Sequence, residues 1–220
     1  MQHPGPIVDQ LTTALATELD DPVLARELAA ILVEDAVLWR APELPPQGAH
    51  AIFGFTFGNR MLANGNRVPG PVNEILADLV CQLHRQTGAP VFAQWEIAEA
   101  VADRVPPATL TSITPGRDAR GEPVYLGTAQ VVAEIAARTG PPKLAGPVVV
   151  VAFSDHLRRV VMNARRAGFD AHAPAGLAMP TAYDPDSGQA WCRSRRAYLL
   201  HDIMIRISER RTAVVGSGWH

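Results

Sequence analysis

A histidine and an arginine stand shortly after an unbroken apolar run in the second half of this chain. The run, residues 147–153, is typical of a strand buried on both faces of a parallel sheet. It leads without a spacer into Ser154 and Asp155, two good N-cap residues, and then into a helical pattern whose first turn carries His156 and Arg159. Open α/β sheets bind their ligands at the carboxyl ends of the strands. The sequence therefore predicts a ligand site here, with all four of these residues in it.

The position of His156 and Arg159 indicates what each could do. A histidine at a helix N-terminus feels the positive end of the helix dipole, which disfavours the imidazolium form, so we expect a neutral His156 that acts as a general base or in hydrogen bonding. Arg159 would hold a phosphate or carboxylate through its planar guanidinium. The alternative is that His156 only caps its own helix and that Arg159 is a solvated surface charge.

A second group of candidates follows the expected strand at residues 90–94. Glu96 and Glu99 are spaced i, i+3 on one face of a short expected helix, where either could orient His156 or act as its acid–base partner. A solvated glutamate in a first helical turn is the alternative. Trp95 either walls the pocket or packs on the sheet.

The segment after the first expected strand, residues 54–70, is long for a connection from a strand to a helix, and such segments are often functional. Gly58 and Asn59 tolerate positive φ and let backbone N–H groups approach an anion, while Arg60 and Arg67 add positive charge. The glycine spacing is not GxGxxG, which argues against a conventional dinucleotide site.

Thr114 and Arg117 follow the third expected strand and could add donors for an anion. The usual chemistry of loops explains these two residues nearly as well. Residues 184–188 contain part of a calcium-loop pattern but lack its distant glutamate, so we interpret them as a turn. No metal-ligand spacing is found among the histidines, and no metal is expected.

Strand and helix patterns alternate from residue 48 onward, which predicts an α/β fold with a doubly wound, five-stranded parallel sheet of the Rossmann-like type. The expected strands are residues 50–55, 90–94, 108–113, 147–153 and 169–173. The expected helices are residues 71–87, 95–105, 123–138, 155–167 and 192–210. In the common strand order 3-2-1-4-5, the loop after the first strand would face the turn at residues 154–159.

The expected division of the chain has three parts. Residues 1–47 form an N-terminal helical pair and a linker, residues 48–212 the Rossmann-like domain, and residues 213–220 a tail. In the helical pair, Asp21 is expected as an N-cap before Pro22.

Composition narrows the function classes. A formal net charge of −2 argues against bulk neutralisation of nucleic-acid phosphates, and Lys143, the only lysine, leaves no Gly-Lys-Ser/Thr phosphate loop. Cys81 and Cys192 form no paired motif, and Cys81 is expected to be a small core residue. With no secretory signal and no apolar window of about 20 residues, we expect a cytoplasmic protein without a membrane or nucleic-acid partner.

Residues 148–169 resemble the YdcF/SanA/ElyC-like family of bacterial proteins, which share a Rossmann-like domain of largely unknown chemistry. The similar features are an apolar strand, a Ser/Thr-rich turn, the His-x-x-Arg motif at His156 and Arg159, and a helix that ends in Gly-Phe. Residues 191–202 are similar to the family's closing Trp/Arg/Glu helix. The family's Ser-Gly-Gly turn after strand two is replaced here by residues 93–96, and its Asn-x-Thr-x-Glu-Asn motif is largely absent from residues 124–130. The resemblance therefore implies roles only for His156 and Arg159.

Together these features predict an enzyme of the transferase or hydrolase type. Its substrate would be a small anionic metabolite, phosphorylated or nucleotide-linked, with His156 assisting the reaction and Arg60 and Arg159 clamping the anion. One alternative is that the same pocket holds S-adenosylmethionine or a nucleotide. Another is a non-catalytic binding or regulatory module whose N-terminal helices form a homodimer interface.

Overall fold

The computed structural model describes residues 5–116, 119–120, 124, 126–139 and 146–217. The chain divides into two compact units, residues 1–40 with 199–220 and residues 41–198. The last helix, α7 (Arg195–Ser217), begins in the second unit and continues in the first. The sequence-based boundaries at residues 47 and 212 kept this helix with the α/β part of the chain, whereas the structural boundaries follow residues 40 and 198.

The first unit contains the two expected N-terminal helices, α1 (Pro6–Leu19) and α2 (Pro22–Ala30), followed by a π-helical segment (Ile31–Leu38). The predicted N-cap is confirmed, because Asp21 Oδ1 accepts hydrogen bonds from the backbone N–H groups of Val23 and Leu24 at 3.0 and 2.9 Å. These bonds satisfy donors that the first turn of a helix leaves without partners.

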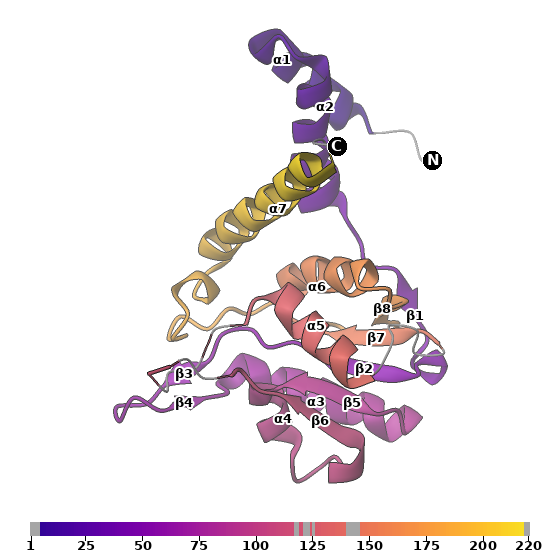
Figure 1. Cartoon of the computed structure of the whole chain (residues 1–220), viewed down its shortest axis with the longest axis vertical. Helices are drawn as coiled ribbons and strands as arrows, with labels where there is room; N and C mark the ends of the chain where they lie inside the picture. The colour runs from indigo at the N-terminus through magenta and orange to yellow at the C-terminus, as the bar shows by residue number, and fades with distance from the viewer. Residues whose placement is uncertain (1–4, 117–118, 121–123, 125, 140–145, 218–220) are drawn as a thin grey trace. The chain divides into compact units, whose positions relative to one another are not determined.

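The second unit is built on a six-stranded parallel sheet (Figure 1). Its strands are β1 (Glu43–Leu44), β2 (Ala51–Gly54), β5 (Val91–Gln94), β6 (Leu110–Ile113), β7 (Val148–Val151) and β8 (Ala171–Pro174). The order is β1-β8-β7-β2-β5-β6, with every neighbouring pair parallel. All five expected strands are present in the expected order 3-2-1-4-5, so the Rossmann-like prediction is confirmed.

The sixth strand, β1, lies in the proline-rich stretch that was interpreted as a linker. It pairs with β8 in the register Glu43↔Ala173, and the backbone N–H of Ala173 donates to the carbonyl of Pro42. A two-residue strand at the edge of a sheet tolerates flanking prolines, because one side of it needs no ladder partner. For this reason the prolines are compatible with β1, although they made the stretch resemble a linker in the sequence.

Helices cover both faces of the sheet. α3 (Pro71–Thr87) packs against α4 (Trp95–Val101) on one face, and α5 (Thr128–Thr139) packs against α6 (Ser154–Arg166) on the other (Figure 1). α3 has the predicted bounds. α4 ends four residues early, and α5 begins only after Gly127, since residues 124, 126 and 127 are not helical.

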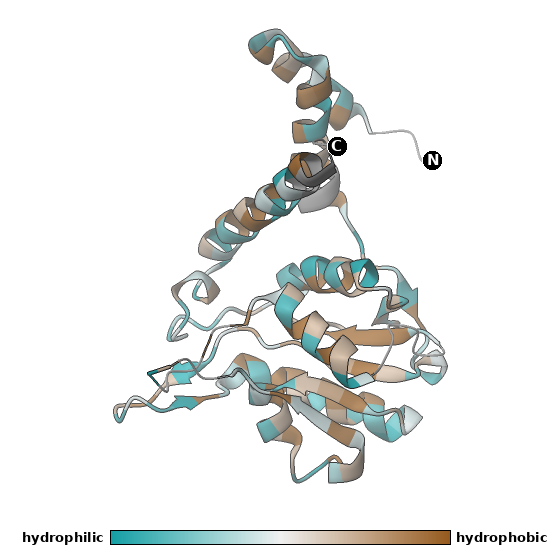
Figure 2. Cartoon of the chain, in the orientation of Figure 1, coloured by the Kyte–Doolittle hydropathy of each residue, from teal (hydrophilic) through white to brown (hydrophobic). Residues whose placement is uncertain are grey.

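The core explains why the apolar runs formed the central strands. All four residues of β2 and of β7 are buried, and these strands are mainly brown in Figure 2 while the outer surface of α6 is teal. Ile52 and Val149 belong to the cluster packed against α3 and α4, whereas Phe53 turns the other way and meets the ring of Phe169 edge-on at 5.0 Å. Cys81 lies in the first cluster at 1% exposure, as predicted.

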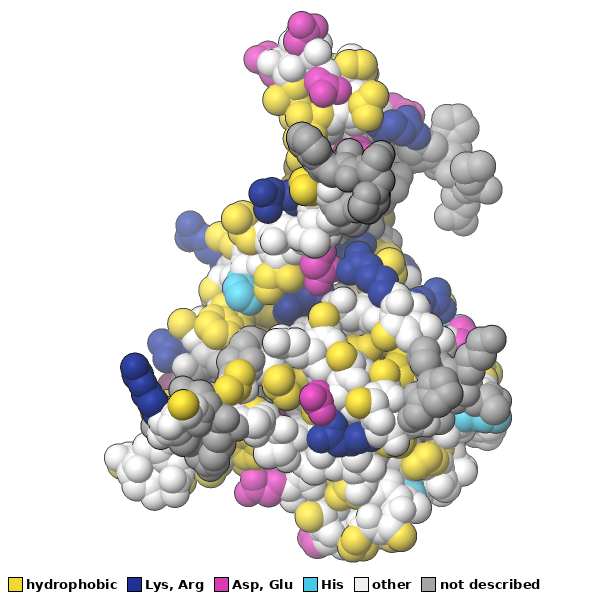
Figure 3. Space-filling model, in the orientation of Figure 1, with side chains coloured by type: hydrophobic (Ala, Val, Ile, Leu, Met, Phe, Trp, Pro, Cys, Tyr) yellow, Lys and Arg dark blue, Asp and Glu magenta, His cyan; other side chains and the backbone are white. Residues whose placement is uncertain are grey.

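Between β2 and α3 the chain forms a small hairpin rather than an irregular loop. β3 (Arg60–Met61) pairs antiparallel with β4 (Arg67–Val68), and residues 55–59 connect this hairpin to the sheet. On the face of the second unit that Figure 3 shows, acidic and basic side chains are dispersed among apolar and uncharged ones.

Candidate functional site

A pocket opens at the carboxyl ends of the strands, where β2 and β7 lie side by side and the connections leave them toward opposite faces of the sheet. This is the switch point at which doubly wound sheets bind ligands. Most of its lining is polar. The described residues that line it are 56–59, 67, 94–96, 113, 115, 124, 126, 128, 156, 159, 189, 191, 192 and 198.

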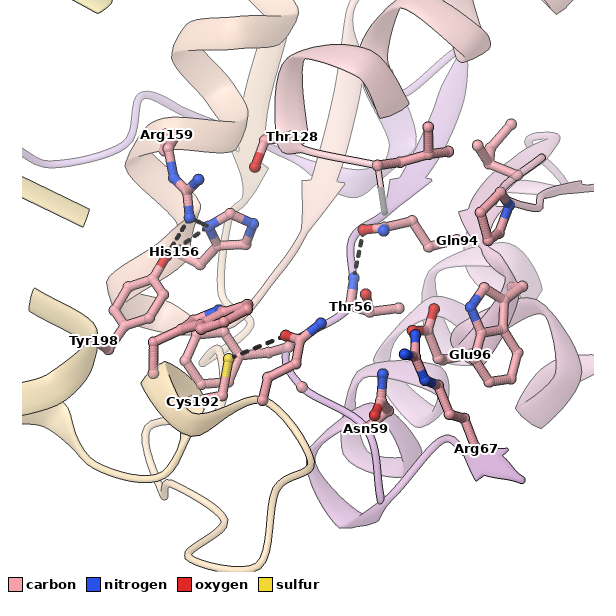
Figure 4. A pocket seen from close by; sticks show the side chains of 18 of the residues that line it. Thr56, Asn59, Arg67, Gln94, Glu96, Thr128, His156, Arg159, Cys192 and Tyr198 are labelled. Atoms are coloured by element: carbon pink, nitrogen blue, oxygen red, sulfur yellow. Dashed lines mark hydrogen bonds between the residues drawn. The ribbon is translucent and has the colours of Figure 1, made fainter. Parts of the chain in front are cut away.

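His156 and Arg159 both line this pocket, and both are held by Tyr198 (Figure 4). The Tyr198 hydroxyl lies 2.7 Å from His156 Nδ1, and Arg159 Nη2 donates to that hydroxyl at 3.1 Å. Arg159 Nη2 also lies 3.3 Å from His156 Nδ1. His156 and Arg159 are only 6% and 8% exposed, so Arg159 is not the solvated surface charge that was the alternative interpretation.

The start of α6 differs from the sequence prediction. The N-cap is Phe153, with no side-chain cap, and Ser154 and Asp155 are the first two helical residues. Ser154 is exposed, and the Asp155 carboxylate accepts hydrogen bonds from Tyr183 Oη at 2.8 Å and Arg195 Nε at 3.1 Å. These tertiary contacts take the Asp155 carboxylate away from its own helix. Neither Ser154 nor Asp155 caps α6 or lines the pocket.

Glu96 is the buried acid of the pocket. It is 5% exposed, and its Oε2 atom has no hydrogen-bond partner among the residues that the structure describes. Burial raises the pKa of Glu96 to about 7, although its own backbone N–H, the Asn59 and Thr56 side chains and the charge of Arg67 lower it. In Figure 4 Asn59 and Arg67 lie beside the Glu96 carboxyl. A carboxyl with such a pKa exchanges its proton near neutral pH.

The other candidates after β5 and β6 divide between pocket and surface. Trp95 lines the pocket, whereas Glu99 is exposed and does not, so the i, i+3 spacing did not give the two glutamates the same environment. Thr114 is exposed outside the lining, with its hydroxyl 3.3 Å from that of Ser112. Arg117 lies outside the described residues.

The loop after β2 is fixed by two amide side chains, of which Asn73 is buried and Gln94 half-buried. Gln94 Oε1 accepts from the Thr56 N–H at 3.0 Å, and Asn73 Oδ1 accepts from the Phe57 N–H at 2.8 Å. Asn73 Nδ2 donates to the carbonyls of Gly58 and Pro69 at 2.7 and 2.6 Å. Asn73 is completely buried, so these bonds hold the pocket floor in one conformation.

Position 58 requires glycine for two reasons, its backbone conformation and the lack of space for a side chain. Its φ of +74° favours glycine, and a Cβ there would lie 2.4 Å from Ser187 Oγ. The segment that approaches Gly58 continues into Gln189, Trp191 and Cys192, which line the pocket.

Arg60 does not line the pocket as the anion clamp that the sequence suggested. Its Nε and Nη2 donate to the two carboxylate oxygens of Asp184, each at 2.9 Å, and Asp186 lies 3.5 Å away. This pair lowers the pKa of Asp184. Residues 184–188 are a turn, as interpreted, and its Gly188 N–H donates to the carbonyl of Asn59 at 2.6 Å. Arg60 therefore anchors this turn to the loop after β2.

Several lining residues were not singled out from the sequence, among them Gln94, Thr128, Gln189, Cys192 and Tyr198. Gln94 ends β5 and Thr128 begins α5, so their position alone could have indicated them. Cys192 and Tyr198 come from the segment before and at the start of α7, which no periodicity connects to the sheet. Burial raises the pKa of the Cys192 thiol to about 12, which keeps it protonated and a poor nucleophile.

Among the described residues, no cluster of three or more His, Cys, Asp or Glu side chains is arranged to hold a metal ion. Within the same part of the chain, no helix combines the length and apolar character needed to cross a membrane.

Fold and pocket together define a Rossmann-like α/β protein with a polar pocket at its switch point. No protein-family model matches the chain, and no curated protein or solved structure matches it. The similarity of residues 148–169 to the YdcF/SanA/ElyC-like family thus stays a prediction.

Proposed function

We propose that this protein is an enzyme that acts on a small anionic metabolite by proton transfer in the switch-point pocket. The observation that carries the proposal is the meeting of Glu96 and His156, from two different strand ends, in one pocket that is also lined by Arg67 and Arg159. Two guanidinium groups in a pocket whose carboxyl is partly protonated near neutral pH favour a negatively charged ligand.

Glu96 is the proton-transfer group in this proposal. As a carboxylate it takes a proton from an attacking hydroxyl or water, and as an acid it returns a proton to the leaving group. A pKa of about 7 makes both forms available at physiological pH. Transfer and hydrolysis differ only in whether the attacking oxygen belongs to a second substrate or to water.

A thermal-shift panel of nucleotides, sugar phosphates and amino acids tests this proposal, because a ligand that binds the native state raises the midpoint of unfolding. Turnover of each stabilising compound is then measured with the wild type, Glu96→Gln and Glu99→Gln. We expect Glu96→Gln to lower kcat by a factor of about 100 or more, a typical contribution of general acid–base catalysis. Glu99→Gln, on the same helix but exposed, is expected to keep wild-type turnover. Binding without turnover by the wild type would instead support a non-catalytic binding module.

A second candidate is that the pocket holds S-adenosylmethionine or a nucleotide. The observation that favours it is the presence of Trp95 and Trp191 in the lining, since aromatic side chains provide stacking surfaces for a nucleobase. Adenosine and S-adenosylmethionine belong in the same panel, and stabilisation by both, but not by sugar phosphates, would favour this candidate over the first.

A further inference from the structure

The hydrogen bonds at His156 determine which ring nitrogen carries the hydrogen when the imidazole is neutral. An arginine has donors only, so the contact of Arg159 Nη2 with Nδ1 at 3.3 Å requires Nδ1 to be the acceptor. The Tyr198 hydroxyl accepts from the same guanidinium and is left to donate its own hydrogen to Nδ1 at 2.7 Å. A neutral imidazole with an acceptor at Nδ1 carries its hydrogen on Nε2.

That second nitrogen faces the pocket. Figure 4 shows the Nδ1 edge of the ring turned to Tyr198 and Arg159, and the opposite edge turned to the interior of the pocket. Thr128 lines the same side. Thr128 and His156 stand in the first turns of α5 and α6, and both helices direct the positive ends of their dipoles here. This side of the pocket therefore presents hydrogen-bond donors to a ligand.

On the other side of the pocket, Glu96 presents a carboxyl group in place of these hydrogen-bond donors. Its Oε2 is buried and without a hydrogen-bond partner among the described residues, whereas buried polar atoms in native proteins are nearly always paired. A ligand group that pairs with it must suit a carboxyl that exists both as an acid and as a carboxylate. A hydroxyl both donates and accepts, so it pairs with either form, while an ammonium suits only the carboxylate.

From these two sides we infer that the pocket binds a phosphate monoester of a polyol or sugar, with the phosphate on the side of His156 Nε2–H and Thr128 and a hydroxyl group on Glu96. This inference rests on the anionic ligand of the proposed function and adds the requirement for a hydroxyl. It assigns Glu96 to substrate recognition as well as to proton transfer.

The test uses two phosphate esters with the same carbon chain, sn-glycerol 3-phosphate and propyl phosphate, titrated calorimetrically into the full-length protein. We expect wild type to bind the hydroxylated ester at least about fivefold more tightly, as one hydrogen bond in a desolvated site provides. In Glu96→Met, which replaces the carboxyl by an apolar side chain of similar size, the two affinities should agree within about twofold. The matched control Glu74→Met, at an exposed position on α3, should keep the wild-type ratio.

Each other result overturns the inference. If wild type binds both esters equally, the pocket binds anions but does not recognise a hydroxyl group. If Glu96→Met keeps the preference, a group other than Glu96 holds the hydroxyl. If wild type binds neither ester, the inference and the anionic substrate of the proposed function fail together. Glu96→Ala serves for the same comparison if the methionine variant does not fold.

Discussion

Tyr198 and His156 are 42 residues apart in the chain, and a hydrogen bond of 2.7 Å joins the phenolic oxygen of one to Nδ1 of the other. Both are buried, and the Tyr198 ring also packs edge-on against Phe57 at 4.8 Å. The bond links the first turn of α6 to the first turn of α7 across the pocket. Together with Arg159 of α6 itself, it gives His156 a fixed orientation.

Tyr198→Phe removes that hydroxyl and keeps the ring. We expect a loss of about 1–2 kcal/mol in the free energy of unfolding, because Nδ1 and Arg159 lose a buried partner. The Nδ1 signal of His156, assigned by ¹⁵N NMR with a His156→Gln variant, should shift because it loses the donor at 2.7 Å, while Arg159 still donates to Nδ1 and keeps the hydrogen on Nε2. Tyr183→Phe is the matched control, because it loses a hydroxyl that binds Asp155 instead and should leave this signal in place. An unchanged Nδ1 signal in Tyr198→Phe would show that this hydroxyl does not donate to His156.

Glu96 should make stability depend on pH between about 4.5 and 7. Its pKa is raised from 4.5 to about 7 on folding, so the folded state holds the proton more tightly than the unfolded state. The stabilisation is complete below pH 4.5 and is lost as the pH rises through 7. A shift of this size corresponds to about 2–4 kcal/mol. Urea unfolding of wild type and Glu96→Gln at pH 5 and pH 8 measures it, since the glutamine variant should gain stability relative to wild type at the higher pH. An equal difference at both pH values would contradict the raised pKa.

Asn73 should be essential to the floor of the pocket. Asn73→Asp keeps an acceptor for the Phe57 N–H but loses both donors, leaving the carbonyls of Gly58 and Pro69 without them. We expect a loss of about 2–4 kcal/mol in the free energy of unfolding, measured by urea titration, because a buried charge is added and two buried acceptors lose their partners. A loss below about 0.5 kcal/mol would show that water replaces the amide there.

Arg60 and Arg67 stand on one hairpin, and only Arg67 lines the pocket. We expect Arg67→Gln to weaken the binding of sn-glycerol 3-phosphate by about threefold to tenfold, because the pocket loses one of the guanidinium charges that line it and attract the anion. Arg60→Gln should change this affinity by less than about twofold. Instead, it should speed hydrogen exchange of the Gly188 amide, because the turn that donates to Asn59 loses its anchor at Asp184. A larger loss of affinity in Arg60→Gln than in Arg67→Gln would reverse these assignments.

The sequence by itself determined the layers and the strand order of this protein. Fully apolar runs such as residues 147–153 are stable only between two layers of helices, and alternation with amphipathic helices leaves few topologies for a parallel sheet. The strand order also predicted the position of the pocket, because ligands bind at the carboxyl ends of the two strands whose connections leave toward opposite faces of the sheet. The sequence did not reveal β1, since two residues at a sheet edge carry no periodic pattern.

Only the tertiary structure decided which polar side chains enter the pocket. Arg60 and Arg67 are equivalent in the sequence, yet Asp184, 124 residues away from Arg60, takes the first and leaves the second at the lining. Glu96 and Glu99 share a helix, but only Glu96 turns into a site dry enough to raise its pKa. Tyr198, the last residue of the second unit in the sequence, contacts His156. Such pairings depend on distances between segments that are remote in the chain, and local patterns of hydrophobicity and charge contain no information about them.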